Sequence, residues 1–289
     1  MSVPMTRSKQ EWPRFEPEKA FYEHVARGYD ITAPSYDEVE GRNEISERVR
    51  RMSLAAAIAA FRPDDRILEL GCGTGRDAVF LARHGISVVA TDVSPAMVAI
   101  TRARAKRDGV GDRVSARVAS ATEAAREGGP YDGAYSNGAV LNLEPDLIGL
   151  GRRLASSLRP GAKSVLTVAN RISLFELLVY PVVARPRKAF RKLGQNVPIP
   201  VSREGAGKRY VVPTRFLSPR EFLSAFGSDF DVESWRGLQV LTPPWNLVDM
   251  ARLFRSVVTP LEALEDRFGP MRGFRSLGAI YLMTLRRRG

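Results

Sequence analysis

The residues with the clearest chemical meaning form a glycine-rich segment, Glu69-Leu70-Gly71-Cys72-Gly73-Thr74-Gly75, between a predicted strand and a predicted helix. Glycines there let the backbone turn sharply and let a ligand lie against the main chain. The start of the following helix offers N–H groups that lack partners. Asp92 ends the next predicted strand, 21 residues after Gly71. Because a carboxylate at that place accepts hydrogen bonds from ribose hydroxyls, the pattern predicts a nucleoside site.

The spacing of the glycines narrows the choice of ligand. A dinucleotide fingerprint needs Gly or Ala at its sixth position, where the helix must approach the sheet closely, and this chain has Arg76 there. A phosphate-binding P-loop is excluded because no Gly-Lys-Ser/Thr follows. The expected ligand is therefore an adenosine without a pyrophosphate.

Two stretches, ILELGCGTG and VVATDVSPAMV, resemble the first two motifs of class I methyltransferases that use S-adenosylmethionine (SAM). The resemblance is strongest to the small-molecule branch that includes ubiquinone and menaquinone biosynthesis, and it extends over residues 22–169. It implies that Glu69 orients the loop and the methionine ammonium, and that Asp92 holds the ribose. The other residues assigned to the cofactor are Gly71, Cys72, Gly73, Gly75, Val93 and Met97, the last with a plain alternative as a core residue.

Other parts of the chain match the same family less closely. Tyr29 in the N-terminal segment would lie near the sulfonium, with Tyr36-Asp37 as a second candidate and lid packing as the alternative. Asn137, after the fourth strand, would face the methyl donor or acceptor. Many relatives carry an Asp beside the adenine, where this chain offers Ser120. His24 is the histidine that could reach the pocket, although a surface position is its alternative; no general base is assigned, and the catalytic candidates are Tyr29, Asn137 and His24.

Strands alternating with helices predict a Rossmann-like, doubly wound α/β fold. We expect a mostly parallel seven-stranded sheet with helices on both faces and an antiparallel last strand. The predicted strands are 66–70, 87–91, 114–118, 131–136, 162–169, 230–241 and 278–285. A helix over 145–158 is expected to close at Pro160-Gly161.

Residues 1–62 are predicted to be an N-terminal helical lid, and 63–289 the SAM-binding domain. Two insertions, 171–215 and 242–275, emerge at the carboxyl edge of the sheet and are expected to form the acceptor side. Helical stretches are predicted at 246–257 and 261–268. Thr242-Pro243-Pro244-Trp245 lacks the leading Asp or Asn of DNA amino-methyltransferases and lies too late in the chain, so it is interpreted as a loop.

The first insertion combines apolar residues with a basic stretch. The cations are Arg185, Arg187, Lys188, Arg191 and Lys192. Such a stretch can lie on a membrane interface or bind a phosphate, and a lid helix with a solvated basic edge is the alternative. The net charge of +12 favours anionic partners, although an arginine-rich genome would explain it equally well.

A single cysteine excludes internal disulfides, and neither a signal peptide nor a membrane-spanning run is visible. The expected location is cytoplasmic, with peripheral membrane contact as an addition. The predicted function is methyl transfer to an apolar or amphiphilic small molecule, such as a quinone, isoprenoid, lipid or natural product, by direct displacement that needs no metal. The alternatives are an RNA-modifying methyltransferase, less favoured because no RNA-binding module is visible, and a non-catalytic SAM-binding protein.

Overall fold

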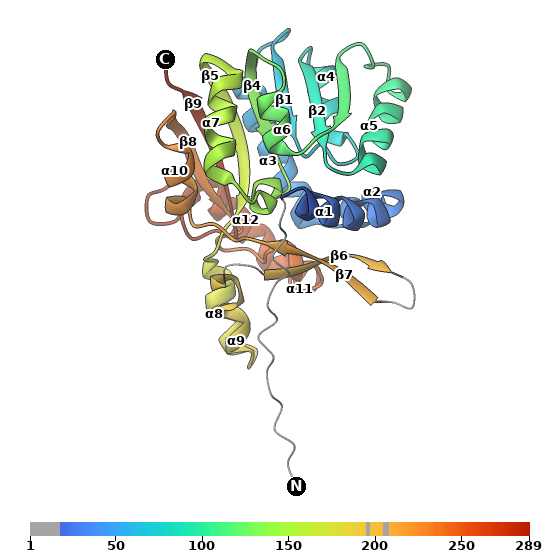
Figure 1. The fold of residues 1–289 in the computed structure, drawn as a ribbon. Helices are drawn as coiled ribbons and strands as arrows, with labels where there is room; N and C mark the ends of the chain where they lie inside the picture. Colours follow the sequence, from blue (N-terminus) through green and yellow to red (C-terminus); the bar gives the residue numbers. More distant parts are fainter. Residues whose placement is uncertain (1–17, 195–196, 205–207) are drawn as a thin grey trace.

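The alternation of apolar strands and helices produces a seven-stranded sheet with helices on both faces (Figure 1). The computed structural model describes residues 18–194, 197–204 and 208–289. The strand order is β3-β2-β1-β4-β5-β9-β8, in which β9 runs antiparallel to both of its neighbours. The predicted fold class is thereby confirmed. The strands are β1 (Arg66–Leu70), β2 (Ser87–Asp92), β3 (Val114–Val118), β4 (Tyr131–Ser136), β5 (Leu158–Ala169), β8 (Phe230–Leu238) and β9 (Ile280–Arg287).

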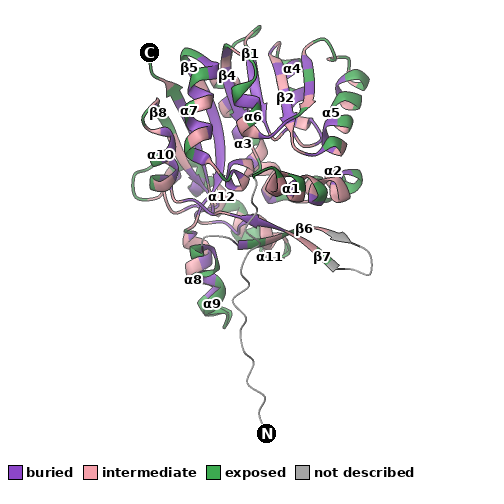
Figure 2. Ribbon diagram, viewed as in Figure 1, coloured by how far each residue is buried: buried purple, intermediate pink, exposed green. Residues whose placement is uncertain are grey.

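Two apolar clusters, one on each side of the sheet, form the core, and Figure 2 shows the central strands as buried. On one side the sheet packs against α3 (Glu44–Ala60), α4 (Arg76–Arg83) and α5 (Pro95–Arg107). On the other side it packs against α6 (Ala121–Arg126), α7 (Leu147–Ser157) and α10 (Pro219–Phe226). Helix α5 begins as its sequence predicts, because the Ser94 hydroxyl accepts a hydrogen bond from the Met97 N–H at 3.1 Å.

The N-terminal helices lie below the carboxyl ends of the strands, where the glycine loop emerges (Figure 1). They are α1 (Glu18–Thr32) and α2 (Tyr36–Gly41), joined by a 3-10 turn that contains Pro34. Helix α3 differs from them, because Val49, Leu54 and Ala57 pack in the core beside the sheet. The cover over the site is thus α1 and α2, whereas α3 belongs to the helix layer; a domain boundary at residue 62 stays a prediction.

The first insertion holds more regular structure than its sequence predicts. It comprises α8 (Leu174–Val182), α9 (Pro186–Ala189), a 3-10 turn at Arg191–Leu193, and a hairpin of β6 (Val197–Glu204) and β7 (Lys208–Thr214). The hairpin packs against α1 (Figure 1). The sequence pattern did not predict these strands because they contain Pro198, Pro200 and Pro213, and proline argues against a central strand. Edge strands such as these two tolerate proline.

The second insertion contains a 3-10 turn at Trp245–Leu247, α11 (Val248–Leu253) and α12 (Arg255–Phe268). The predicted helical stretches are present, but α12 runs through Pro260 instead of beginning after it. Four strands differ in their bounds: β5 starts at Leu158, so that Pro160-Gly161 lies within the strand, β8 ends at Leu238, β2 continues to Asp92, and β9 spans Ile280–Arg287 instead of 278–285. No helix in the described ranges is long and apolar enough to cross a bilayer.

Candidate functional site

The glycine loop and Asp92 meet at the carboxyl ends of β1 and β2. The Asp92 carboxylate accepts hydrogen bonds from the N–H groups of Gly73 and Ser94, both at 2.9 Å. These bonds use part of the acceptor capacity of a carboxylate, which has about four lone-pair sites. Gly73 has φ +52°, and a Cβ there would meet nothing within 4 Å. The loop therefore presents open backbone next to a fixed carboxylate.

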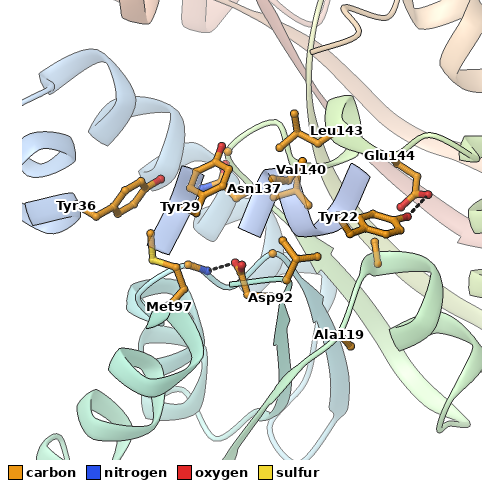
Figure 3. Close-up of a pocket in the computed structure, with 16 residues that line it drawn as sticks. Tyr22, Tyr29, Tyr36, Asp92, Met97, Ala119, Asn137, Val140, Leu143 and Glu144 are labelled. Carbon is orange, nitrogen blue, oxygen red and sulfur yellow. Dashed lines mark hydrogen bonds between the residues drawn. The ribbon is translucent and has the colours of Figure 1, made fainter. Parts of the chain in front are cut away.

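A pocket opens at this point, between the sheet edge and α1 (Figure 3). Its floor is the glycine loop with Asp92, Val93 and Met97, and its far side is the segment that follows β4. We call it the donor pocket. The complete lining is Tyr22, Val25, Tyr29, Tyr36, Gly71, Gly73, Asp92, Val93, Met97, Ala119, Ala121, Asn137, Gly138, Val140, Leu143 and Glu144.

Side-chain hydrogen bonds hold α1 and α2 over the donor pocket. The Tyr22 hydroxyl donates to Glu144 at 2.7 Å, as Figure 3 shows, and the Ser94 hydroxyl donates to Asp30 at 2.5 Å. The carboxylate of Asp37 accepts a hydrogen bond from the Thr74 hydroxyl at 2.6 Å. These three contacts hold α1 and α2 in place over the donor pocket.

Burial dominates the acid–base properties of the pocket. It raises the pKa of Asp92, against the lowering effect of the N–H groups of Ser94 and Gly73. It also raises the pKa of Glu144 to about 7, although hydrogen bonds from Tyr22 and Thr122 act in the opposite direction. Glu144 therefore changes its charge near neutral pH, beside the lid.

Several predicted residues lie in or directly behind the donor pocket. Tyr29, Val93, Met97 and Asn137 line it, together with Gly71, Gly73 and Asp92. Gly75 begins α4, and Cys72 is buried near the Thr101 hydroxyl. Glu69 is also buried, and its Oε2 has no partner among the described residues.

Besides Glu69, Cys72 and Gly75, two predicted residues lie outside the lining of the donor pocket, and their side chains bond elsewhere. The Ser120 hydroxyl caps α6 through reciprocal hydrogen bonds with Glu123. His24 faces the hairpin, where its ring hydrogen bonds to the Val211 carbonyl at 2.9 Å and to the Tyr210 hydroxyl at 2.9 Å. The roles that the sequence assigned to them stay predictions.

A second cavity adjoins the donor pocket and extends under the hairpin. We call it the acceptor cavity. Tyr29, Tyr36, Asn137, Gly138 and Leu143 line both spaces, so they mark the junction. The rest of its lining comes from α2, α3, the strand ends, the hairpin and the second insertion: Glu40, Ser46, Glu47, Val49, Arg50, Ala139, Ala169, Ile199, Pro200, Val201, Thr214, Phe216, Gln239, Trp245 and Ile280.

Asn137 is held rigidly at the junction. Its amide donates to Asp77 at 3.1 Å, and its carbonyl accepts from the Thr167 hydroxyl at 3.0 Å. The Tyr29 hydroxyl has no hydrogen-bond partner within the described ranges, and burial raises its pKa. Near the junction the walls are therefore aromatic and amide groups rather than exposed charges.

The sequence did not reveal three residues of the acceptor cavity, namely Glu40, Gln239 and Trp245. Glu40 lies near the end of a short helix with no motif around it, and Gln239 follows a strand. The Pro-Pro pair before Trp245 indicated a loop within the insertion 242–275, which was predicted to form the acceptor side, but no local signal singled out Trp245 itself.

The basic stretch requires one correction. Lys192 is not an exposed cation: its side chain is 3% exposed and pairs with the buried Glu176 at 2.6 Å. It also lies over the Phe216 ring. A buried ammonium needs a buried counter-charge, and Glu176, 16 residues earlier on α8, supplies one. Lys192 therefore holds the segment that follows α9 against α8. The prediction that Lys192 contacts a membrane or a phosphate is wrong.

The donor pocket fits the features of SAM. The space at Gly73 admits a ligand against the main chain, and Asp92 keeps acceptor sites for the ribose hydroxyls. The orphaned Oε2 of Glu69 is a buried carboxyl oxygen that can accept a hydrogen bond from a nearby ammonium. Arg76 occupies the position at which a dinucleotide site has Gly, and its guanidinium forms a bidentate ion pair with Glu47 of α3 at 2.7 and 2.9 Å.

Comparisons with known proteins agree with this geometry. Residues 67–161 match the family model described as a methyltransferase domain. The chain is 36% identical over 107 residues to the ubiquinone biosynthesis O-methyltransferase of Xanthomonas axonopodis pv. citri, which is 37% of this chain and 44% of that protein. It is 26% identical over 194 residues to the 27-O-demethylrifamycin SV methyltransferase of Amycolatopsis mediterranei, which is 62% of this chain and 68% of that protein.

The similarity to the first curated relatives is partial, since the matches span 44% to 49% of their length. Among solved structures, the geranyl diphosphate C-methyltransferase of Streptomyces coelicolor A3(2) superposes with a TM-score of 0.58 at 17% identity, over 92% of this chain and 98% of that one. That likeness concerns the fold alone. Residues 67–161 therefore form a methyltransferase domain, and its strand order and glycine loop are those of class I SAM-dependent methyltransferases.

Proposed function

We propose that the protein transfers the methyl group of SAM to a small, largely apolar or amphiphilic molecule bound in the acceptor cavity. The observation that carries this proposal is the junction at which five residues line both the donor pocket and the acceptor cavity. Methyl transfer by direct displacement requires donor and acceptor atoms in line and in contact. Two adjoining spaces with a shared wall provide that arrangement.

The composition of the acceptor cavity supports a small-molecule acceptor. Phe216, Ile199 and Ile280 supply apolar surface, whereas Glu40 and Arg50 supply polar groups on the opposite, helical wall. Ligand sites of this kind are mostly apolar, with a few placed polar groups. The names of the two curated relatives, a ubiquinone biosynthesis enzyme and a rifamycin methyltransferase, agree with this class of acceptor.

SAM supplies an electrophilic methyl group on a sulfonium. The protein contributes alignment and exclusion of water, since the rings of Tyr29 and Tyr36 cover the junction and Asn137 is fixed by Asp77 and Thr167. Two carboxylates line the acceptor cavity, and Glu47 is paired with Arg76, so Glu40 is the one we propose to take a proton when the accepting atom carries one. Burial raises the pKa of Glu40, which makes its carboxylate a stronger base than an exposed one. The proposed displacement uses no metal, so turnover should survive dialysis against EDTA.

The deciding experiment uses methyl-labelled SAM with separated lipid, small-molecule, RNA and protein fractions of cells. We expect label in the lipid or small-molecule fraction, and much less of it with the Asp92→Ala variant at a SAM concentration that does not saturate the variant. Label in RNA would favour the nucleic-acid alternative. Calorimetric binding of SAM without transfer to any fraction would indicate a non-catalytic SAM-binding protein.

We also propose that α8 and α9 rest on an anionic membrane surface. The helices α8 and α9 project from the body, and much of them is exposed (Figures 1 and 2). Val182, Leu178 and Phe190 are 85%, 61% and 55% exposed. The four exposed cations form no ion pair with any described residue; they are Arg185, Arg187, Lys188 and Arg191. Exposed apolar side chains beside unpaired cations are typical of interfacial segments.

Sedimentation with vesicles tests the membrane proposal. Each cation contributes about 1 kcal/mol on anionic lipid, so changing all four to Gln should abolish binding to vesicles of phosphatidylserine and phosphatidylcholine. A matched control changes Arg51, Arg62, Lys106 and Arg152, exposed cations elsewhere on the molecule, to Gln. Equal loss in both variants would show that net charge alone governs binding and would refute a specific surface.

A further inference from the structure

Gln239 is a buried amide that the protein leaves without partners. Its side chain lines the acceptor cavity, the residue is 1% exposed, and neither Nε2 nor Oε1 has a hydrogen-bond partner within the described part of the chain. Leaving a buried polar group unpaired costs about 1–3 kcal/mol. An amide in such a place therefore indicates a polar partner that enters the cavity.

A comparison with Asn142 shows that this is not the rule for buried amides in the protein. The Asn142 amide donates to the carbonyls of Ala169 and Arg215 at 2.8 and 2.7 Å, and its oxygen accepts from the Ala169 N–H at 2.8 Å. Asn142 thus has a structural function that the fold satisfies. Gln239 has no such function within the fold.

The backbone beneath Gln239 is fixed by Glu265, a buried carboxylate of α12. Glu265 accepts hydrogen bonds from the N–H groups of Gln239, Val240 and Leu241 at 2.9, 2.8 and 3.1 Å, and from the Thr242 hydroxyl at 3.0 Å. Gln239 itself has φ +57°, in the left-handed region. This loop presents the amide from a rigid support, as a binding group requires.

The strand order places Gln239 far from the methyl-transfer junction. Asn137 follows β4, whereas Gln239 follows β8, and β5 and β9 lie between them. Three strand spacings amount to roughly 14 Å. Phe216 and Ile280 line the same cavity with apolar surface. A molecule that reaches both points must therefore be elongated and mostly apolar.

We propose that Gln239 recognises a polar group at the far end of an elongated acceptor, distant from the atom that is methylated. An amide offers a donor and an acceptor side by side, so its best partner is a group that does the same, such as a carboxamide, a lactam or a protonated carboxylic acid. This inference rests on the proposed function and narrows its class of substrate.

Calorimetry with two matched probes tests the inference: 4′-hydroxybiphenyl-4-carboxamide, and 4-hydroxybiphenyl, which lacks the carboxamide. The protein is first saturated with S-adenosylhomocysteine, the demethylated product of SAM. We expect the carboxamide to bind about tenfold more tightly to the wild type, the equivalent of one well-made hydrogen-bonded pair. In Gln239→Leu the two probes should bind equally. Retention of the preference in Gln239→Leu, or failure of both probes to bind the wild type, would overturn the inference.

Thermal unfolding without probes gives a second test that does not depend on the choice of probe. Gln239→Leu removes an unpaired amide and should leave Tm unchanged or raise it, whereas Asn142→Leu breaks three hydrogen bonds and should lower Tm by several degrees. Equal losses in both variants would show that Gln239 is structural. Failure of the wild type to bind SAM or S-adenosylhomocysteine would instead overturn the proposed function, so the two failures are distinguishable.

Discussion

The donor pocket and the acceptor cavity share a wall, but they are built in opposite ways. Much of the donor pocket comes from two consecutive strand-to-helix turns, with Gly73 and Asp92 only 19 positions apart in the sequence. The acceptor cavity brings together α2, α3, the hairpin and the loop after β8, which are separated by up to 200 residues. A site made of local turns is encoded by a short motif, whereas a site assembled from distant segments depends on their packing.

The largest expected effect is the loss of stability on replacing Glu265, which fixes the loop after β8 on the acceptor side. Glu265→Ala removes a carboxylate that is 1% exposed, leaves the backbone N–H groups of Gln239, Val240 and Leu241 without that partner, and takes one of the carboxylates away from Arg48. We expect a loss of about 3–5 kcal/mol in the free energy of unfolding, measured by urea denaturation. Asp266→Ala is the control: it also removes a partner of Arg48, but one that is 55% exposed, so it should cost less than about 1 kcal/mol. Similar losses in both variants would contradict a special anchoring function for Glu265.

Changes on the donor side should lower the affinity for SAM. Asp92→Ala removes the carboxylate that the structure holds against the glycine loop, and with it the predicted acceptor of two ribose hydroxyls. We expect SAM affinity to fall about 100-fold, which corresponds to about 3 kcal/mol, in a calorimetric titration. Asp92→Asn retains the shape and should lose less. Binding of the biphenyl probes should remain, because the change lies in the other half of the site; unchanged SAM affinity would contradict the assignment of Asp92.

The same contrast explains what the sequence could and could not predict. The strands 66–70, 114–118 and 131–136 were predicted with their observed bounds, because each is a short segment bounded by turn residues. The Ser94 cap and the positive-φ glycines of the loop follow from local rules as well. The positions of Gly71, Gly73 and Asp92 follow from those elements, whereas Tyr22 and Glu144 reach the donor pocket from other parts of the chain.

The acceptor side lacked such signals. The burial of Lys192 depends on Glu176 facing it after the chain has turned through α9, and a run of basic residues gives no sign of that. The end of β8 is set by Glu265, which lies 26 positions beyond Gln239 and draws the backbone N–H groups out of strand geometry. Tertiary hydrogen bonds of this kind leave no periodic pattern in the sequence from which they could be predicted.

The pH dependence of stability should come from the donor side. Burial raises the pKa of Glu144 from 4.5 to about 7, so the folded state binds this proton more tightly than the unfolded chain does. The stabilisation is present below pH 4.5 and is lost as pH rises through about 7, by roughly 3 kcal/mol. In Glu144→Gln, which mimics the protonated acid, the unfolding free energy should lose this slope and exceed that of the wild type at pH 8. Parallel curves for the two proteins between pH 4.5 and 8 would refute it.

The smallest effect tests the lid itself. Tyr22→Phe keeps the ring that lines the donor pocket but removes the hydroxyl that donates to Glu144 at 2.7 Å. A single hydrogen bond contributes about 1 kcal/mol, so SAM should bind about fivefold more weakly. The effect should be larger at pH 8 than at pH 5.5, because the hydrogen bond then ends on an ionised carboxylate.

Tyr180→Phe is the matched control, since it removes the hydroxyl that accepts from Asn246 at 3.4 Å on the acceptor side. If the lid at Tyr22 serves the donor pocket, SAM affinity should fall in Tyr22→Phe and stay constant in Tyr180→Phe; an equal response would mean that the two halves of the site are not independent.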